Sequence, residues 1–263
     1  METKFVRHNG ARLAYKAHGE GQAVVLLHGF CGSSAYWEQV LPLLPDNYRF
    51  IAPDLRGHGE SASPEGEYTM EAFAGDLAEL LQQLRIERAI VLGHSLGGYA
   101  TLAFAERHPE LLAAFGLIHS TAFPDSDEAK EGRLKGMDTI REKGISAFVE
   151  GLAPKLFAPV HLQTMAQAVR ETVAIGRGTH PEGAIRTLDG MRRRPDRNHV
   201  LAEAKMPVLI VAGDHDQVIP AERAFSVTGG QIAQRQIAGA GHMSMMEAPH
   251  KLAQVIVEFI TTV

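Results

Sequence analysis

The sequence contains one cysteine, Cys31, among 263 residues. A single cysteine excludes an intramolecular disulfide and fits a reducing compartment, so we expect a cytoplasmic protein. The chain has no run approaching the roughly 18 apolar residues that a membrane helix needs. Its first residues also lack the apolar stretch of a signal peptide. These absences favour a protein without a membrane partner.

Neither sign of charge dominates, because 26 Lys and Arg face 31 Asp and Glu and the net charge is −5. A mildly acidic chain gives no electrostatic reason to expect a nucleic acid. The short basic run Arg192–Arg194 is interpreted as a solvated surface, with an anion-binding site as the alternative. Metal-ligand spacing and a dinucleotide fingerprint are both missing from the sequence, so we predict no metal and no cofactor. The oligomeric state stays open.

Short apolar runs alternate with amphipathic segments, which is typical of a parallel sheet with helices on both faces. A hairpin is expected at Asn9-Gly10, and a helix is expected around Trp37, another from Thr69, and others at 221–227 and 249–260. The sequence predicts eight strands, at 4–7, 12–16, 23–27, 48–52, 88–92, 113–118, 208–212 and 233–237.

The alternation breaks near Phe123 and resumes after 199. Between these points the sequence predicts four charged, amphipathic helical stretches, at 128–143, 145–152, 160–175 and 182–193. We therefore expect a core domain made of 1–122 and 200–263. Residues 123–199 are expected to form a helical cap, or lid, over the edge where the strands end.

Ser95 stands in the pattern Gly93-x-Ser95-x-Gly97, between an apolar strand and a helical run. Residues without a Cβ relieve the crowding where a strand turns at once into a helix. The serine at such a corner has an exposed hydroxyl, and the helix N-terminus favours a developing anion beside it. A glycine-rich turn without chemistry is the alternative interpretation. The context favours a nucleophile.

A serine nucleophile needs a base and an orienting carboxylate. His242 is the strongest candidate base, because it follows the last predicted strand in a glycine-rich loop. Asp216 is the favoured acid because it precedes a short apolar pair and Pro220, and Asp214 is the fallback. The chain order Ser, Asp, His is the one found in α/β hydrolases.

With these pieces in place, the chain resembles the α/β-hydrolase-fold superfamily, in the branch of serine esterases, lactonases and carbon–carbon bond hydrolases. The resemblance rests on 28–30 (His-Gly-Phe), 54–61, 93–98, 213–216 and 241–242. It implies a mostly parallel eight-stranded sheet, a Ser95–His242–Asp216 triad, and an oxyanion hole made by the amides of Phe30 and Leu96. Relatives that dehalogenate or open epoxides have aspartate at the nucleophile position, and this chain has serine.

Four further residues are expected to lie along the substrate, with bracing of a loop or packing in the core as the alternative role. They are His28, Gly29, His94 and Met243.

A carboxylesterase that acts on small esters through an acyl-enzyme is the expected function. A lactonase or carbon–carbon hydrolase would use the same triad and would need a cation facing the pocket, for which Arg177, Arg186 and Arg192 are candidates. A small-molecule receptor with a retained pocket is the third possibility. The sequence leaves the natural substrate open.

Overall fold

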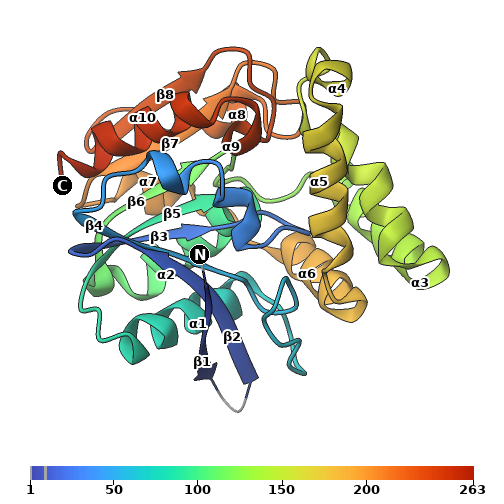
Figure 1. Ribbon diagram of the computed structural model, residues 1–263, viewed down its shortest axis with the longest axis horizontal. Helices are drawn as coiled ribbons and strands as arrows, with labels where there is room; N and C mark the ends of the chain where they lie inside the picture. Colours follow the sequence, from blue (N-terminus) through green and yellow to red (C-terminus); the bar gives the residue numbers. More distant parts are fainter. Residues whose placement is uncertain (1, 9–10) are drawn as a thin grey trace.

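The structure is a computed structural model that describes residues 2–8 and 11–263, so the predicted Asn9-Gly10 turn lies outside the described residues. Its strands form one eight-stranded sheet in the order β1-β2-β4-β3-β5-β6-β7-β8, which confirms the predicted mostly parallel sheet (Figure 1). The pairs β1–β2 and β2–β4 are antiparallel, and the other neighbours are parallel. The strands are β1 (Thr3–His8), β2 (Ala11–His18), β3 (Gln22–Leu27), β4 (Tyr48–Pro53), β5 (Ala89–His94), β6 (Leu112–Ile118), β7 (Val208–Gly213) and β8 (Ile232–Ile237).

Both faces of the sheet are covered, as successive side chains of β3 show. Val25 and Leu27 belong to the apolar cluster that contains α1 (Met70–Gln83) and α2 (Leu96–Arg107). Val24 and Leu26 point the other way, into the cluster built around α10 (Pro249–Ile260). Neighbouring strand residues face opposite sides of a sheet, so a strand covered on both faces is a continuous apolar run.

Two of the helices predicted for the core domain differ in the structure, and the predicted stretch 160–175 is divided at Met165 into α4 (His161–Thr164) and α5 (Ala166–Arg177). The segment around Trp37 forms two short 3-10 helices, η1 (Ser34–Trp37) and η2 (Leu41–Leu43), because Pro42 has no N–H to continue an α-helix. The expected helix at 221–227 ends early, as α8 (Ala221–Ala224). By contrast, α1 begins where predicted, with the Thr69 side chain accepting a hydrogen bond from Ala72 N–H.

Five helices lie between β6 and β7 in the chain: α3 (Asp127–Leu156), α4 (His161–Thr164), α5 (Ala166–Arg177), α6 (Pro181–Arg193) and α7 (Asn198–Ala202). Figure 1 shows α3, α5 and α6 gathered beside one another at one side of the sheet. Gly144 interrupts α3 with a φ of 82°, at the predicted boundary between two helical stretches. None of the described helices is both long and apolar enough to cross a membrane. The role of 123–199 as a lid stays a prediction.

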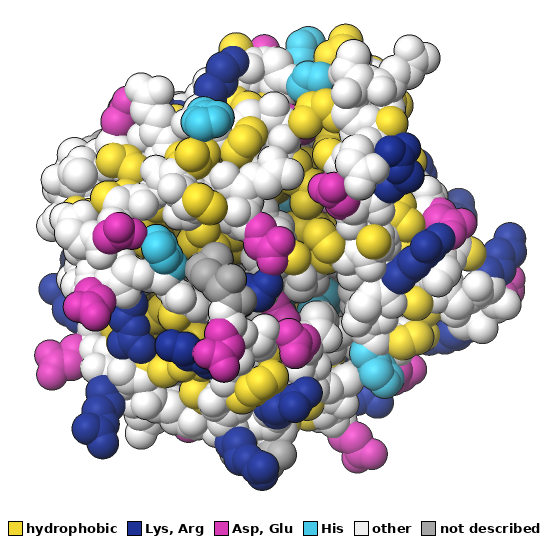
Figure 2. Space-filling view, in the orientation of Figure 1, with side chains coloured by type: hydrophobic (Ala, Val, Ile, Leu, Met, Phe, Trp, Pro, Cys, Tyr) yellow, Lys and Arg dark blue, Asp and Glu magenta, His cyan; other side chains and the backbone are white. Residues whose placement is uncertain are grey.

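The parallel strands β3, β5, β6, β7 and β8 all end at the same edge of the sheet. Polar groups at the carboxyl ends of parallel strands therefore converge in space, although they are far apart in sequence. Charged side chains of both signs are spread over the face seen in Figure 2. Because surface charge of both signs is spread over this face, we take the polar residues that gather at the strand ends as the candidate site.

Candidate active site at the carboxyl edge of the sheet

Ser95 occupies a strained corner between β5 and α2. Its φ of 50° and ψ of −111° are rare for a residue with a side chain. The Ser95 N–H donates to the Ile118 carbonyl at 3.0 Å, and the Ser95 carbonyl accepts from the Ser120 hydroxyl at 2.8 Å. From 89 to 105, Ser95 is the one residue that is not buried. The corner therefore presents this side chain outward from an otherwise closed segment.

Close packing at the corner explains its glycines. A Cβ on Gly93 would collide with the backbone of Gly97, and a Cβ on Gly29 would lie only 3.3 Å from Cβ of Ser95. The loop after β3 thus passes directly beside the serine. Within the described chain, the amides of Phe30 and Leu96 have no hydrogen-bond acceptor. Two free N–H groups next to a hydroxyl are the components from which an oxyanion hole is made.

His242 and Asp216 lie together at the ends of β8 and β7. The Nδ1 atom of His242 is 2.8 Å from Oδ2 of Asp216, and both side chains are buried. Asp214, the fallback acid, is exposed and accepts instead from Gly239 N–H. The structure therefore brings Asp216, and not Asp214, to the imidazole. Among the described residues, no hydrogen bond joins the Ser95 hydroxyl to His242, although both residues line one cavity.

Asp216 has a second imidazole partner that the sequence analysis missed. His119 directly follows β6, and its Nδ1 lies 3.0 Å from the same Oδ2 atom. The other oxygen, Oδ1, accepts from the N–H groups of Val218 and Ile219, both at 2.9 Å. His119 could have been identified from the sequence, because it directly follows the predicted strand 113–118 at the carboxyl edge of the sheet.

These contacts determine the charge of the buried cluster. Burial alone would raise the pKa of Asp216, but attraction to His242 and hydrogen bonds from both imidazoles outweigh burial and hold that pKa well below its usual range. Burial lowers the pKa of His119 despite the carboxylate beside it. The cluster therefore combines an ionised carboxylate with a second imidazole that stays neutral at physiological pH.

Glu247 and His94 fix the loop that carries His242. The buried carboxylate of Glu247 accepts from the N–H groups of Gly241 and Met243, on either side of the histidine. It also accepts from Ala158 N–H, in the segment that follows α3. His94 Nε2 lies 2.9 Å from the His242 carbonyl and donates to it. The sequence pattern gave no indication of Glu247.

A cavity of about 450 Å³ opens over Ser95 and His242. Its apolar lining comes from the strand-edge loops, α2 and the helices between β6 and β7, and includes Phe30, Tyr99, Phe148, Leu152, Leu188 and Met191. Of the four residues expected along the substrate, only His94 is part of the lining. His28 instead accepts from Leu55 N–H and donates to the Gly29 carbonyl, which braces the loop. His28, Gly29 and Met243 are buried behind the lining.

Basic side chains are part of the cavity lining, but they are not those suggested by the sequence. Arg133, Arg194 and Arg223 line it, together with Asp125, Ser126 and Thr121. Arg194 is only 7% exposed and donates to Asp125 at 2.6 Å, so the interpretation of the basic run as solvated surface is wrong for this residue. Arg133 donates to the other oxygen of Asp125 at 3.1 Å.

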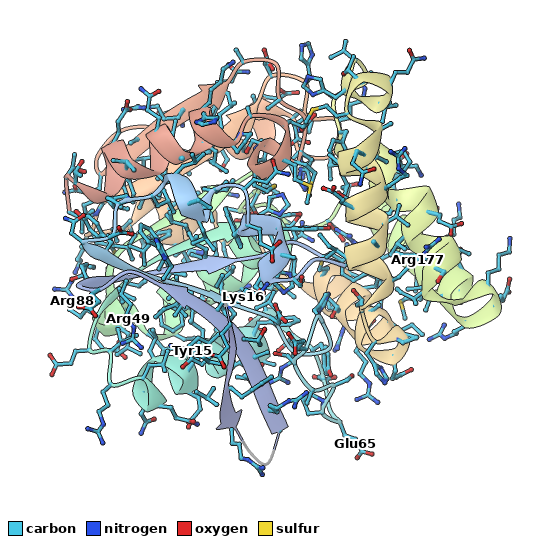
Figure 3. All side chains as sticks on the ribbon, viewed as in Figure 1. Tyr15, Lys16, Arg49, Glu65, Arg88 and Arg177 are labelled. Carbon is cyan, nitrogen blue, oxygen red and sulfur yellow. The ribbon has the colours of Figure 1, made fainter. Side chains whose placement is uncertain are left out.

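The three arginines that the sequence offered as pocket cations lie elsewhere. Figure 3 places Arg177 out on the helices at the side of the molecule, where its guanidinium pairs with Glu150 of α3. Arg186 pairs with Glu182, and Arg192 pairs with Asp189. Amphipathic helices present charged residues on more than one face, and sequence spacing did not identify the face toward the cavity.

Two other chemical possibilities at this edge are explained by simpler contacts. Potential ligand atoms of His119, Asp216 and His242 lie within 4.8 Å of one another, close enough to hold a metal ion. Both imidazoles nevertheless use Nδ1 to donate to one carboxylate oxygen, so hydrogen bonding accounts for their approach. Cys31 is buried, and burial raises the pKa of its thiol, which opposes a nucleophilic role.

Comparison with known proteins places this geometry in a family. The family model of the alpha/beta hydrolase fold matches residues 22–168. An esterase from Thermogutta terrifontis, solved with malate bound, is 32% identical and superposes with a TM-score of 0.93, covering 100% of this chain and 99% of the esterase. The enol-lactonase from Burkholderia xenovorans LB400 is 25% identical, with a TM-score of 0.89 over 98% of this chain and 100% of the lactonase.

A third relative is 2-hydroxy-6-oxo-6-(2'-aminophenyl)hexa-2,4-dienoic acid hydrolase from Metapseudomonas resinovorans. It is 27% identical over 98% of this chain and 90% of its own length. An esterase and a lactonase thus share the architecture of this protein, and a dienoic acid hydrolase is similar to it in sequence. All three relatives are named for hydrolytic reactions. The chain belongs to the α/β hydrolase family.

Proposed function

We propose that this protein is a serine hydrolase that cleaves small carboxylic esters through an acyl-enzyme intermediate. The observation that carries the proposal is the 2.8 Å hydrogen bond between Asp216 and His242, beside a cavity that Ser95 also lines. Ser95 has the outward-facing hydroxyl, His242 is the one imidazole of the cavity lining that is bonded to a carboxylate, and the free amides lie beside the serine. The esterase relative supports the same reaction class.

In the first half of the reaction, the Ser95 hydroxyl turns toward Nε2 of His242, gives up its proton and attacks the ester carbonyl. Both residues line one cavity, and catalytic hydrogen bonds often form only with substrate present. Asp216 accepts from Nδ1 of His242, so the free lone pair faces the serine and the imidazolium that forms is stabilised. The amides of Phe30 and Leu96 bind the oxyanion, and each such donor contributes about 3 kcal/mol.

In the second half, His242 donates its proton to the leaving alcohol, and the ester C–O bond breaks. Water then enters the cavity, gives a proton to His242 and attacks the acyl-enzyme carbonyl. The returning proton regenerates the Ser95 hydroxyl and releases the carboxylic acid. Each of these steps uses side chains or amides of this chain.

Turnover of p-nitrophenyl acetate and butyrate tests the proposal. We expect hydrolysis by the wild-type protein and a loss of about 10⁵-fold in kcat for Ser95→Ala. Ser146→Ala is the control, because this serine is exposed on α3 and is not among the residues that line the cavity. Ester turnover that persists in Ser95→Ala would contradict the assignment of the nucleophile.

The arginines of the cavity favour a second candidate, a lactonase or carbon–carbon bond hydrolase for an acidic substrate. Arg133, Arg194 and Arg223 face only one carboxylate of the lining, Asp125, which leaves an excess of positive charge. The esterase relative was solved with malate, a dicarboxylate, and the second structural relative is an enol-lactonase. A panel of esters and lactones, each with and without a free carboxylate, distinguishes the two candidates.

A further inference from the structure

His119 is a fully buried titratable side chain with no part in the reaction steps above. It bonds to the same oxygen of Asp216 as the cavity-lining His242, and the two ring centroids are 5.8 Å apart. Its Nδ1 completes a set of four hydrogen bonds to the carboxylate, with the two amides on Oδ1 and the two imidazoles on Oδ2. Each oxygen of Asp216 thus accepts two hydrogen bonds, which matches the roughly four lone pairs of a carboxylate.

The hydrogen-bond network fixes the tautomer of His119. An ionised carboxylate only accepts, so Nδ1 of His119 carries the proton. The other nitrogen, Nε2, lies 2.7 Å from the hydroxyl of Ser244, which is also fully buried. Because Nε2 has a lone pair in this tautomer, the Ser244 hydroxyl donates to it. Ser244 therefore holds the ring with its proton directed at Asp216.

The surroundings of His119 keep the ring neutral. The charged and titratable groups that face it are Asp216 after β7, His242 after β8, His94 at the end of β5, and Glu247 of α9 (Ser244–Glu247). Burial and the nearby His242 oppose protonation, and the two carboxylates only partly offset them. A neutral ring adds a hydrogen bond without adding a second cation next to the imidazolium that catalysis forms on His242.

We propose that His119 is a positioning residue, which orients the Asp216 carboxylate toward His242 and limits the negative charge that this carboxylate presents to it. The inference rests on the proposed function, because it assigns Asp216 and His242 to the reaction. A carboxylate oxygen that accepts from two imidazoles attracts each proton less strongly than one that accepts from a single imidazole. Loss of the His119 donor therefore makes His242 a stronger base and frees the carboxylate to turn.

Two substitutions of similar size separate this role from simple packing. In His119→Asn, the amide nitrogen takes the position of Nδ1 and can still donate, while in His119→Leu no donor remains. Asparagine also tolerates the observed φ of 49° better than most residues. We expect kcat/KM to stay within about threefold in the Asn variant and to fall about tenfold in the Leu variant.

The pH profile is the readout that a packing role would not move. Activity requires neutral His242, so in His119→Leu the acidic limb of kcat/KM should move to higher pH by about half a unit. The limb should stay in place in His119→Asn. An unmoved limb in the Leu variant, or an equal shift and loss in both variants, overturns the proposal. Thermal melts of both proteins report whether each has folded.

Proton NMR of the ¹⁵N-histidine-labelled wild-type protein tests the geometry without turnover and without any variant. We expect two low-field protons bonded to imidazole Nδ1 atoms, one from His119 and one from His242. A single such proton contradicts the shared carboxylate, even if the Leu variant does not fold. If the protein hydrolyses no ester, the proposed function fails, while two low-field protons would still confirm the bonding of His119 to Asp216.

Discussion

Two buried carboxylates, Asp216 at the strand edge and Asp125 in the cavity lining, each have two side-chain nitrogen partners. At the strand edge, Asp216 accepts from His242 and His119. At the second carboxylate, which we call the arginine site, Asp125 accepts from Arg133 and Arg194, and the guanidinium carbon of Arg194 lies 3.9 Å from the centroid of the Tyr99 ring. Both carboxylates have a lowered pKa, because in each case charge attraction and hydrogen bonds outweigh burial.

The partners differ in what they can do with a proton. Imidazole gains and loses a proton near neutral pH, whereas guanidinium stays charged. The strand edge is therefore equipped for proton transfer, and the arginine site provides fixed positive charge. This difference suggests that the strand edge performs the chemistry and that the arginine site recognises the substrate.

The largest effect is expected from comparing the two candidate acids at the strand edge. Asp216→Asn removes the carboxylate that holds His242, and we expect kcat for ester hydrolysis to fall about 10⁴-fold. For Asp214→Asn, kcat should stay within about threefold of the wild-type value, because the exposed Asp214 accepts from Gly239 N–H and not from His242. Steady-state kinetics on a p-nitrophenyl ester measures both. Equal losses would show that Asp216 is not the acid.

At the arginine site, removal of the Asp125 carboxylate should affect folding first. Asp125→Leu leaves the buried Arg194 without its ionic partner, and such losses cost about 3–5 kcal/mol of unfolding free energy. Asp127→Ala, a fully exposed neighbour paired with Lys130, is the control and should change stability by less than about 0.5 kcal/mol. Urea unfolding compares them. A stable Asp125→Leu protein would mean that the arginine finds another partner or solvent.

The strand edge should also respond to acid, because it contains buried neutral histidines. Burial lowers the pKa of His28 to about 4, below the unfolded value of 6.5. The unfolded chain therefore binds the proton first, and stability falls as the pH drops from about 6.5 toward 4. Between pH 7 and pH 5 the contribution of this residue is about 2 kcal/mol.

His28→Gln keeps an acceptor for Leu55 N–H and removes the titration. Its stability should therefore fall less than that of the wild type over the same pH range, as measured by urea unfolding at pH 7 and pH 5. An equal loss of unfolding free energy in the two proteins would show that His28 has the same pKa in the folded and the unfolded chain.

The smallest effect is expected from substitution of an arginine at the arginine site. For an ester with a free carboxylate, Arg133→Met should raise KM about tenfold, since one charge-assisted hydrogen bond is lost. For a neutral ester of the same length, KM should stay unchanged. Arg177→Met is the matched control, since Arg177 pairs with Glu150 away from the cavity. The same KM change for both esters would argue against charge recognition.

The strand edge could be predicted in detail, because each of its parts leaves a local pattern. A corner such as Gly93–Gly97 needs small residues, and buried strands appear as continuous apolar runs. Chain order then placed Asp216 and His242 after the correct strands. The choice between Asp214 and Asp216 rested on neighbouring residues, and the structure joins Asp216 to the imidazole.

The remaining parts depend on tertiary packing that no local pattern encodes. His119 and Glu247 act through contacts with residues far away in sequence. The cavity arginines were misassigned, because the sequence predicted helical stretches between β6 and β7 but not the face that each helix turns toward the cavity. The sequence analysis also missed α7 and the break between α4 and α5. Arg194 directly follows Arg192 and Arg193, which are both more exposed to solvent than Arg194. Only the tertiary fold buries Arg194 against Asp125.

Covalent labelling with a p-nitrophenyl alkylphosphonate is the most direct test of the central claim, that Ser95 is a nucleophile activated by His242 and Asp216. Peptide mass spectrometry should find one phosphonyl group, on Ser95, with labelling slowed strongly in His242→Ala and Asp216→Asn. Labelling of another residue, or unlabelled Ser95 in a protein that still hydrolyses esters, would contradict the account.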